Sequence, residues 1–188
     1  MRWTELFDDL EAQYAAQEAD ERRGEVAEHT RDSLGRVALA ERYLADLGRR
    51  VQMRLRGGVP VEGTLSEIGH GWLVLADSAG ARPRESLVVA ANVLTVQGLS
   101  GRSDVGRPGR VQRTLGLRHV LRALSRDRAT VRVHLVEGGT MTGTIDRVGA
   151  DHLDLGAHPA DLPRRTREVH SVVTIPVDAL SALVRDGD

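Results

Sequence analysis

The chain of 188 residues contains no cysteine and no lysine. Without cysteine it can form no disulfide, no thiol nucleophile and no thiolate zinc site. Aromatic residues make up only 3% of the chain, which excludes a binding surface that stacks many rings on a ligand. The core must therefore be built from Val, Leu and Ala.

Long apolar runs are also missing. No segment approaches the roughly 20 apolar residues that a membrane-spanning helix needs, and residues 1–11 are acidic, without the apolar core of a secretory signal. We therefore expect a cytoplasmic protein that does not enter a membrane.

Common catalytic motifs are absent as well. The sequence has no Walker loop, dinucleotide fingerprint, nucleophile elbow or zinc-protease helix motif. His152 and Asp154 share one face of an expected strand, but their spacing fits no established metal motif. We expect a protein that is not an enzyme and that needs no cofactor or metal.

The formal net charge is −1, but the two signs are separated along the chain. Residues 1–30 carry nine acidic residues and three arginines, a net of −6, whereas residues 97–135 carry nine arginines and two aspartates, a net of +7. Arginine suits bidentate contacts with phosphate, although its exclusive use also fits a genome poor in A and T codons. We expect the acidic segment to compete with phosphates for the basic segment.

A gapless internal repeat relates two parts of the chain at an offset of 80 residues. Residues 51–75 overlay residues 131–155 with eight identities. The identical pairs are Val51/Val131, Leu55/Leu135, Gly58/Gly138, Gly63/Gly143, Thr64/Thr144, Gly69/Gly149, Leu73/Leu153 and Leu75/Leu155. Residues 89–96 then match 175–182 at an offset of 86, which predicts a loop six residues longer in the second copy.

Each copy is predicted to contain five short strands. Residues 131–135 alternate apolar and polar side chains, and residues 51–55 repeat that pattern. Gly63 and Gly143 lie inside the second strand of each copy, where glycine is typical of a sharp bend or a close approach of two backbones. A short sheet bent at a fixed point favours closure into a small barrel.

An amphipathic helix is predicted ahead of each set of strands. The first carries Leu34, Val37, Leu44 and Leu47, and Gly48 is expected to end it. The second has Leu117, Val120, Leu121 and Leu124 on one face. Arg118, Arg122 and Arg126 recur every four residues along another face of that second helix.

The predicted fold class is α+β, mainly β, with two tandem five-stranded small β-barrels, each preceded by an amphipathic helix. Residues 1–33 are expected to form an acidic N-terminal helical segment, and residues 34–99 the first barrel with its leading helix. Residues 100–113 are expected to form a basic, glycine-rich linker, and residues 114–188 the second barrel with its leading helix.

The spacing Val131-x-Val133-x-Leu135-x-x-Gly138-x-x-Met141-x-Gly143-x-Ile145-x-x-Val148 resembles the first signature motif of the Sm-like family, which includes Sm and bacterial Hfq-like proteins. Residues 51–68 follow the same pattern. The resemblance covers about two thirds of the chain and implies small SH3-like barrels, RNA binding and self-assembly.

The residues with which that family recognises uridine-rich RNA are absent. Gly69 or Gly149 stands at the position of the family's Asp, neither third strand contains Asn, and residues 86–96 and 171–183 contain no basic pair. The resemblance therefore implies the fold and nucleic-acid binding, without the family's base pocket.

The leading functional hypothesis is a non-catalytic protein that binds nucleic acid, RNA in preference to DNA, through arginine–phosphate contacts of low base specificity. The candidate arginines lie in the basic segment and in equivalent loops of the two copies. They are Arg107, Arg110, Arg113, Arg118, Arg122, Arg126, Arg128, Arg82, Arg84, Arg164 and Arg165. The alternative for these residues is a solvated face or pairing with acidic side chains.

The competing hypothesis is a protein–protein assembly scaffold that uses barrel edges and the N-terminal helix, and in either case we expect a homo-oligomer. The candidate interaction surface is Leu6, Phe7, Leu10, Tyr14 and Trp72. For Trp72 the alternative is that it covers a helix or the other barrel. A nucleic-acid binder needs Arg118, Arg122 and Arg126 unpaired on one surface, whereas a scaffold would pair or bury them.

Overall fold

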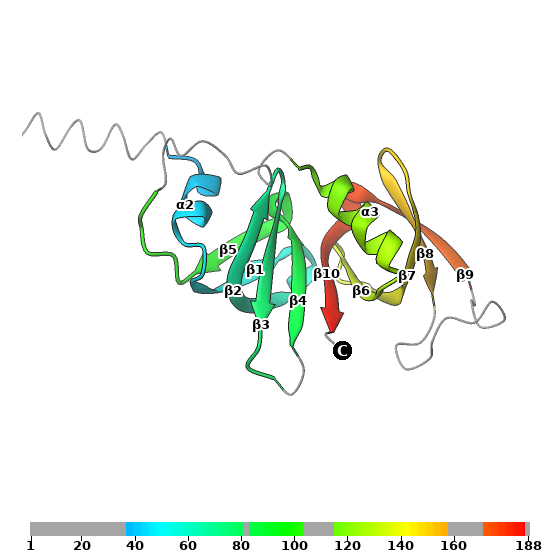
Figure 1. The fold of residues 1–188 in the computed structure, drawn as a ribbon, viewed down its shortest axis with the longest axis horizontal. Coiled ribbons are helices and arrows are strands. Elements are labelled where there is room, and N and C mark those ends of the chain that lie inside the picture. Colours follow the sequence, from blue (N-terminus) through cyan, green and yellow to red (C-terminus); the bar gives the residue numbers. More distant parts are fainter. Residues whose placement is uncertain (1–36, 81–82, 104–114, 158–170, 187–188) are drawn as a thin grey trace, which may run out of the picture. The chain divides into compact units, whose positions relative to one another are not determined.

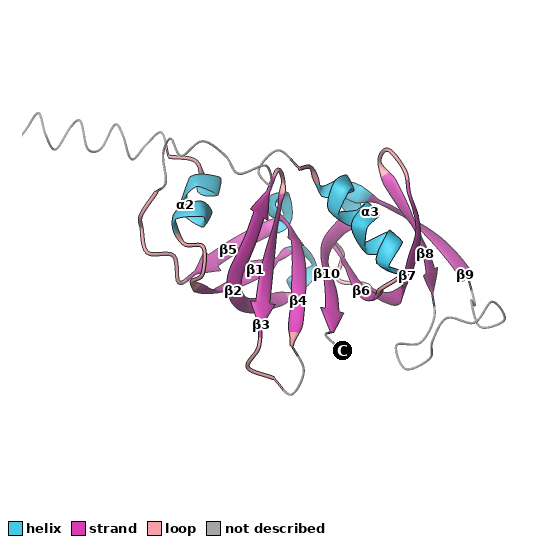
Figure 2. Ribbon diagram, in the orientation of Figure 1, coloured by secondary structure: helices cyan, strands magenta, loops and turns pink. Residues whose placement is uncertain are grey.

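The computed structural model describes residues 37–80, 83–103, 115–157 and 171–186. They form two α-helices and ten strands, and all ten strands belong to one antiparallel sheet (Figures 1 and 2). Both repeats fall within one compact unit, Ala40–Asp188. Neither described helix has the length and apolar character that crossing a membrane requires.

The elements of the two repeats follow the same order. The first repeat consists of α2 (Leu39–Ala45), β1 (Arg50–Leu55), β2 (Pro60–Gly69), β3 (Trp72–Asp77), β4 (Arg84–Val89) and β5 (Val93–Gln97). The second consists of α3 (Leu117–Asp127), β6 (Thr130–Leu135), β7 (Thr140–Val148), β8 (His152–Ala157), β9 (Ser171–Pro176) and β10 (Leu180–Asp186). A short 3-10 turn, Ala90–Asn92 or Val177–Ala179, precedes the last strand of each repeat.

The sheet runs in the order β5-β1-β2-β3-β4-β10-β6-β7-β8-β9. The five strands of each repeat lie in the same order. In both repeats the fifth strand, β5 or β10, lies beside the first strand, β1 or β6. The prediction of two closed five-stranded barrels is wrong, because the sheet is continuous and does not close into barrels. β4 pairs with β10 of the second repeat, whereas in a closed barrel it would pair with β5 of its own repeat.

The junction between the repeats is the antiparallel pairing of β4 with β10, which runs from Ala182 opposite Val88 to Asp186 opposite Arg84. Residues 86–89 of β4 are all buried, as are residues 181–184 of β10. A strand that is covered on one face buries only every second residue. Both faces of the junction are therefore covered.

The strand pairings correct the predicted alignment of the fourth and fifth strands. Leu73 of β3 pairs with Val88, and its counterpart Leu153 of β8 pairs with Ile175, an offset of 87 rather than 86. The pairings of the fifth strands with β1 and β6 give the same offset. Because side chains alternate along a strand, this slip of one residue exchanges the two faces.

The bends in the second strands occur at equivalent places. The register of β2 shifts between Leu65 and Glu67, and that of β7 shifts between Ile145 and Arg147. A Cβ at Gly63 would lie 2.9 Å from the carbonyl oxygen of Ala76. The predicted close approach of backbones at this glycine is confirmed.

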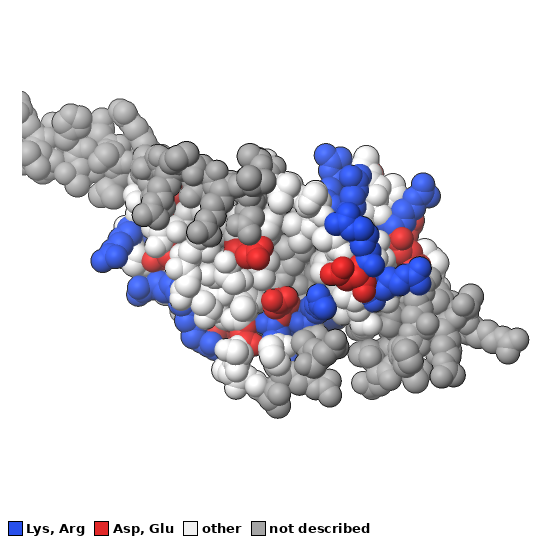
Figure 3. All heavy atoms as spheres, viewed as in Figure 1, with Lys and Arg blue, Asp and Glu red and all other residues white. Residues whose placement is uncertain are grey.

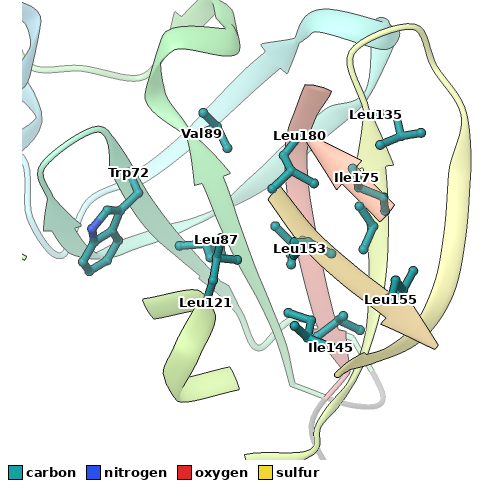
Figure 4. Packing of buried hydrophobic residues seen from close by; sticks show 13 residues of the cluster. Trp72, Leu87, Val89, Leu121, Leu135, Ile145, Leu153, Leu155, Ile175 and Leu180 are labelled. Atoms are coloured by element: carbon teal, nitrogen blue, oxygen red, sulfur yellow. The ribbon is translucent and has the colours of Figure 1, made fainter. Parts of the chain in front are cut away.

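The apolar cores of the two repeats exchange residues across the junction. Figure 4 shows one of the two clusters, in which residues of both repeats pack together. Trp72, Leu87 and Val89 of the first repeat pack in the cluster that contains Leu121 of α3. In return, Ala182 of β10 packs in the cluster of the first repeat. The two repeats therefore share one hydrophobic interior along β4 and β10.

Polar contacts fix the same junction. The buried amide of Asn92, the only asparagine in the chain, donates a hydrogen bond from Nδ2 to the carbonyl of Leu180 at 2.7 Å. The hydroxyl of Ser181 donates to the carbonyl of Arg56 at 2.8 Å. At Gly57, whose φ is +82°, a Cβ would lie 2.5 Å from the carbonyl oxygen of Leu135. Glycine is required there for both reasons.

Replacing Asn92 tests the polar part of this junction. Asn92→Ala leaves the buried carbonyl of Leu180 without its donor, so we expect the free energy of unfolding to fall by about 1–3 kcal/mol. Urea denaturation with an unchanged m value measures the loss. Gln97→Ala, which removes an exposed amide of β5, should change stability by less than about 0.5 kcal/mol. Equal effects of the two substitutions would contradict this account of the junction.

Candidate nucleic-acid interface

Helix α3 carries the arginine row that the sequence predicts. Leu121 is fully buried, and Leu117, Val120 and Leu124 pack partly buried around it, so the apolar face of the helix rests on the sheet. Arg118, Arg122 and Arg126 are exposed. Figure 3 shows basic side chains gathered over the part of the surface that α3 occupies, with acidic groups beside them. The predicted division of the helix into an apolar and a basic face is confirmed.

The arginines of this row, Arg118, Arg122 and Arg126, make few contacts with the rest of the described protein. Arg118 donates from Nη1 to the carbonyl of Ala150 at 3.1 Å, and it forms no ion pair with an acidic side chain of the described residues. Arg122 and Arg126 form no hydrogen bond or ion pair within the described part of the chain. Three cations thus follow one another along a single helix.

The first repeat holds the start of α3 in place. Trp72 of β3 donates from Nε1 to the carbonyl of Leu115 at 2.8 Å, and the backbone N–H of His70 donates to the same carbonyl at 3.2 Å. The side chain of Trp72 is buried, with 3% of the residue exposed. Trp72 therefore covers the start of the helix and presents no ring to a base or a partner at the surface.

A groove of about 860 Å³ opens at the N-terminal end of the arginine row, where the two repeats meet. Its basic side chains are Arg56, His70 and Arg118, and its acidic side chains are Asp151 and Asp178. The first turn of α3 contains no acidic residue. The groove therefore presents charges of both signs, and the guanidinium of Arg118, which contacts the carbonyl of Ala150, lies beside the residue that precedes Asp151.

Arg56 and His70 belong to this groove but were not among the predicted site residues. Each lies directly before a glycine with positive φ, Gly57 or Gly71. At the repeat offset of 80 residues they correspond to Val136 and Ala150. Comparing the two repeats for positions that are polar in the first repeat and apolar in the second would have identified Arg56 and His70.

Arg84 lies elsewhere among the described residues. It is part of β4 and lines a second groove, of about 520 Å³, together with Arg132 and His134. Burial lowers the pKa of His134, and the charge of Arg132 lowers it further. The two grooves share no lining residue, so Arg84 does not extend the row on α3.

Many predicted residues lie outside the described ranges. They are Arg82, Arg107, Arg110, Arg113, Arg164 and Arg165 of the candidate nucleic-acid contacts, and Leu6, Phe7, Leu10 and Tyr14 of the candidate interaction surface.

The histidine and aspartates near β8 form pairs and no larger group. His152 Nδ1 lies 2.8 Å from Asp151 Oδ1, and this contact lowers the pKa of the Asp151 carboxyl. Asp154 accepts a hydrogen bond from the hydroxyl of Thr174 at 2.7 Å. In the described ranges no three His, Asp or Glu side chains are grouped to hold a metal ion.

Arg128 ends α3 in an unusual conformation. Its φ of 49° and ψ of 31° are left-handed, and among the described residues it is the only one other than glycine with positive φ. An L side chain there costs about 1–2 kcal/mol, and glycine is the common residue at this position after a helix. The cation at the end of the arginine row therefore sits on a strained backbone.

Arg128→Gly should relieve this strain and raise the free energy of unfolding by about 0.5–1 kcal/mol, after the greater freedom of glycine in the unfolded chain is included. Urea denaturation measures the change. Arg126→Gly removes the same charge from the last turn of α3, where the backbone is right-handed, and should instead lower stability by about 0.5–1 kcal/mol. A loss of stability in both variants would contradict the strain at Arg128.

No protein-family model matches the chain, and no curated protein matches it.

Proposed function

We propose that this protein is a non-catalytic nucleic-acid-binding protein that contacts phosphates through the arginine row of α3. One observation carries the proposal: Arg118, Arg122 and Arg126 are exposed along one helix, and none of them pairs with an acidic side chain in the described part of the chain. This arrangement is the one that distinguishes a nucleic-acid binder from a scaffold in which the same cations are paired or buried.

The helix geometry makes the row suitable for a phosphate backbone. Four residues of α-helix rise about 6 Å and turn about 40° beyond a full rotation, so successive arginines stay on neighbouring parts of one face. Each guanidinium that neutralises a phosphate releases condensed counterions, which is the main source of affinity in sequence-independent binding.

The groove at the start of α3 limits where the bound strand can make contact. Arg56 and Arg118 attract phosphate there, while Asp151 and Asp178 repel it. We therefore expect the strand to follow α3 and to contact the groove at Arg118 and Arg56 alone.

Low base specificity is part of the proposal because contacts with phosphates carry no information about the base sequence. Both aromatic residues in the described ranges, Tyr43 and Trp72, are buried, so these residues offer no ring on which a base could stack. The preference for RNA over DNA rests on the Sm-like sequence pattern, and the experiment below therefore compares both.

The test is the salt dependence of binding to single-stranded RNA and DNA of generic sequence. About five neutralised phosphates on a single strand should give a slope of log affinity against log salt concentration near −3.5. The triple substitution of Arg118, Arg122 and Arg126→Gln should reduce the slope by up to about 2 units. Mobility shifts across a salt series measure both slopes.

The matched control removes three arginines from the first repeat and the segment that follows it. Arg42, Arg54 and Arg102→Gln changes the net charge by the same amount and should leave the slope nearly unchanged. If the two triple variants lose affinity equally, binding reflects net charge and the row has no special role. If the α3 variant keeps its affinity but loses self-association, the row is a protein interface.

A second candidate function, the assembly scaffold, is favoured by a different observation. Leu94 of β5 and Val172 of β9 are each 60% exposed, and each lies on one of the two outermost strands of the sheet. Apolar side chains on open strand edges are suited to pairing with another chain.

A further inference from the structure

The groove of about 520 Å³ that contains Arg84 is formed by both repeats. The first repeat supplies residues of β1, β2, β3 and β4, and the second repeat supplies residues of β6 and β10. None of its lining residues belongs to α3. The groove is therefore separate from the arginine row.

Three neighbouring strands place polar side chains on one face at this groove. Val184 of β10 pairs with Ser86 of β4 on one side and with Arg132 of β6 on the other. Residues directly opposite one another on neighbouring strands project to the same face. Arg84 and His134 lie two residues from Ser86 and Arg132 along their strands, so they project to that face as well. Two guanidinium groups, an imidazole and a hydroxyl thus line one groove.

The hydroxyl of Ser86 has no partner. Ser86 is 5% exposed, and the other residues of its buried stretch, residues 87–89, are all apolar. The hydroxyl forms no hydrogen bond with any residue of the described ranges. At the offset of 87 residues its counterpart is Val173, so the strand itself does not require a hydroxyl at this position. Because a buried polar group without a partner is destabilising, this hydroxyl indicates a ligand in the groove.

The acidic residues of the groove have cationic neighbours on one side of it. The guanidinium of Arg50 lies 2.9 Å from the carboxylate of Glu62 and 3.3 Å from that of Asp77. Arg84 lies opposite Asp77 on β3 and opposite Asp186 on β10. Arg50 and Arg84 therefore offset most of the negative charge on this side.

The surroundings of His134 are cationic. Burial lowers the pKa of His134, and the charge of Arg132 lowers it further. Among the described residues, no acidic side chain contributes to this shift. Arg132 interacts elsewhere within the protein as well, but a guanidinium has five N–H donors and can contact an anion in addition. Negative charge is therefore favoured between Arg132 and His134.

We propose that this groove binds a phosphate dianion, held by the guanidinium of Arg132, the imidazole of His134 and the hydroxyl of Ser86. The oxygens of the dianion accept hydrogen bonds from all three groups, so the buried hydroxyl gains its partner. A phosphodiester, as in a nucleic-acid backbone, carries only one negative charge and gains less from the two cationic groups. The site should therefore prefer free phosphate or a phosphate monoester to a diester.

The imidazole of His134 reports this binding directly. Its NMR signal, assigned with His134→Gln, should shift with added sodium phosphate and reach a plateau, whereas sodium chloride at the same ionic strength should give no plateau. A pH series in sodium sulfate, a dianion whose charge is constant where histidine titrates, should raise the pKa of His134 by about one unit at saturation. That rise corresponds to about tenfold tighter binding to the protonated imidazole.

Two esters identify the form of phosphate that binds. Dimethyl phosphate, a diester, should require at least about tenfold higher concentration than inorganic phosphate for the same shift of the His134 signal. Equal binding of methyl phosphate and inorganic phosphate would identify a monoester site, and weaker binding of methyl phosphate a site for free phosphate. Both of these results support the proposal.

Substitutions test the two other contacts. Arg132→Gln should weaken phosphate binding at least about tenfold, and Ser86→Ala at least about threefold. Ser86→Ala should not lower the Tm measured without phosphate, because it removes a buried hydroxyl that has no partner. Arg54→Gln is the matched control, since it removes the same charge from an exposed position of β1 outside this groove and should leave the affinity unchanged.

Three results would overturn the proposal. A shift that grows with phosphate as it does with chloride would show an effect of ionic strength alone. Equal losses of affinity in Arg132→Gln and Arg54→Gln would show attraction to net charge. A response of His134 to single-stranded RNA but not to inorganic phosphate would make the groove part of the nucleic-acid path. None of these variants changes α3, so failure here leaves its proposed function untouched.

Discussion

The pairing of β4 with β10 is the contact on which the rest of the structure depends. It joins two repeats into one sheet along strands whose central residues are buried on both faces, and it brings Leu87 and Val89 into the cluster beneath α3. Trp72, on the strand beside β4, then reaches the carbonyl of Leu115 and fixes the start of the helix. The orientation of the arginine row is thus set by residues of the other repeat.

The strands could be predicted from the sequence because their signals are local. The alternation of apolar and polar side chains over residues 131–135 predicts a strand from those five residues alone. A glycine inside a strand likewise predicts a bend from its own position. The partner of a strand at an open edge of a sheet is not encoded in such local patterns. Backbone hydrogen bonds are the same for any partner, so the sequence of β4 does not distinguish closure within a repeat from pairing with β10. The prediction of separate barrels failed at this point.

The alignment of the last two strands failed for a related reason. Leu94 and Thr95 match Leu180 and Ser181 in residue type, which favours an offset of 86, yet the pairings require 87. Because residues 181–184 are buried on both faces, that strand has no alternation with which to check the register. At the structural offset Leu94 corresponds to Ser181 and not to the core residue Leu180, and Leu94 is 60% exposed on β5.

The arginine row could be predicted because residues four apart in a helix lie on neighbouring parts of one face. The helices of the two repeats differ at these positions. At the repeat offset, Arg118, Arg122 and Arg126 correspond to Ala38, Arg42 and Asp46. Asp46 is buried and accepts a hydrogen bond from the backbone N–H of Ser100 at 2.8 Å, so it serves the fold of the first repeat. Within the described residues, α3 therefore carries such a row and α2 does not, so the proposed phosphate contact depends on the helix of the second repeat.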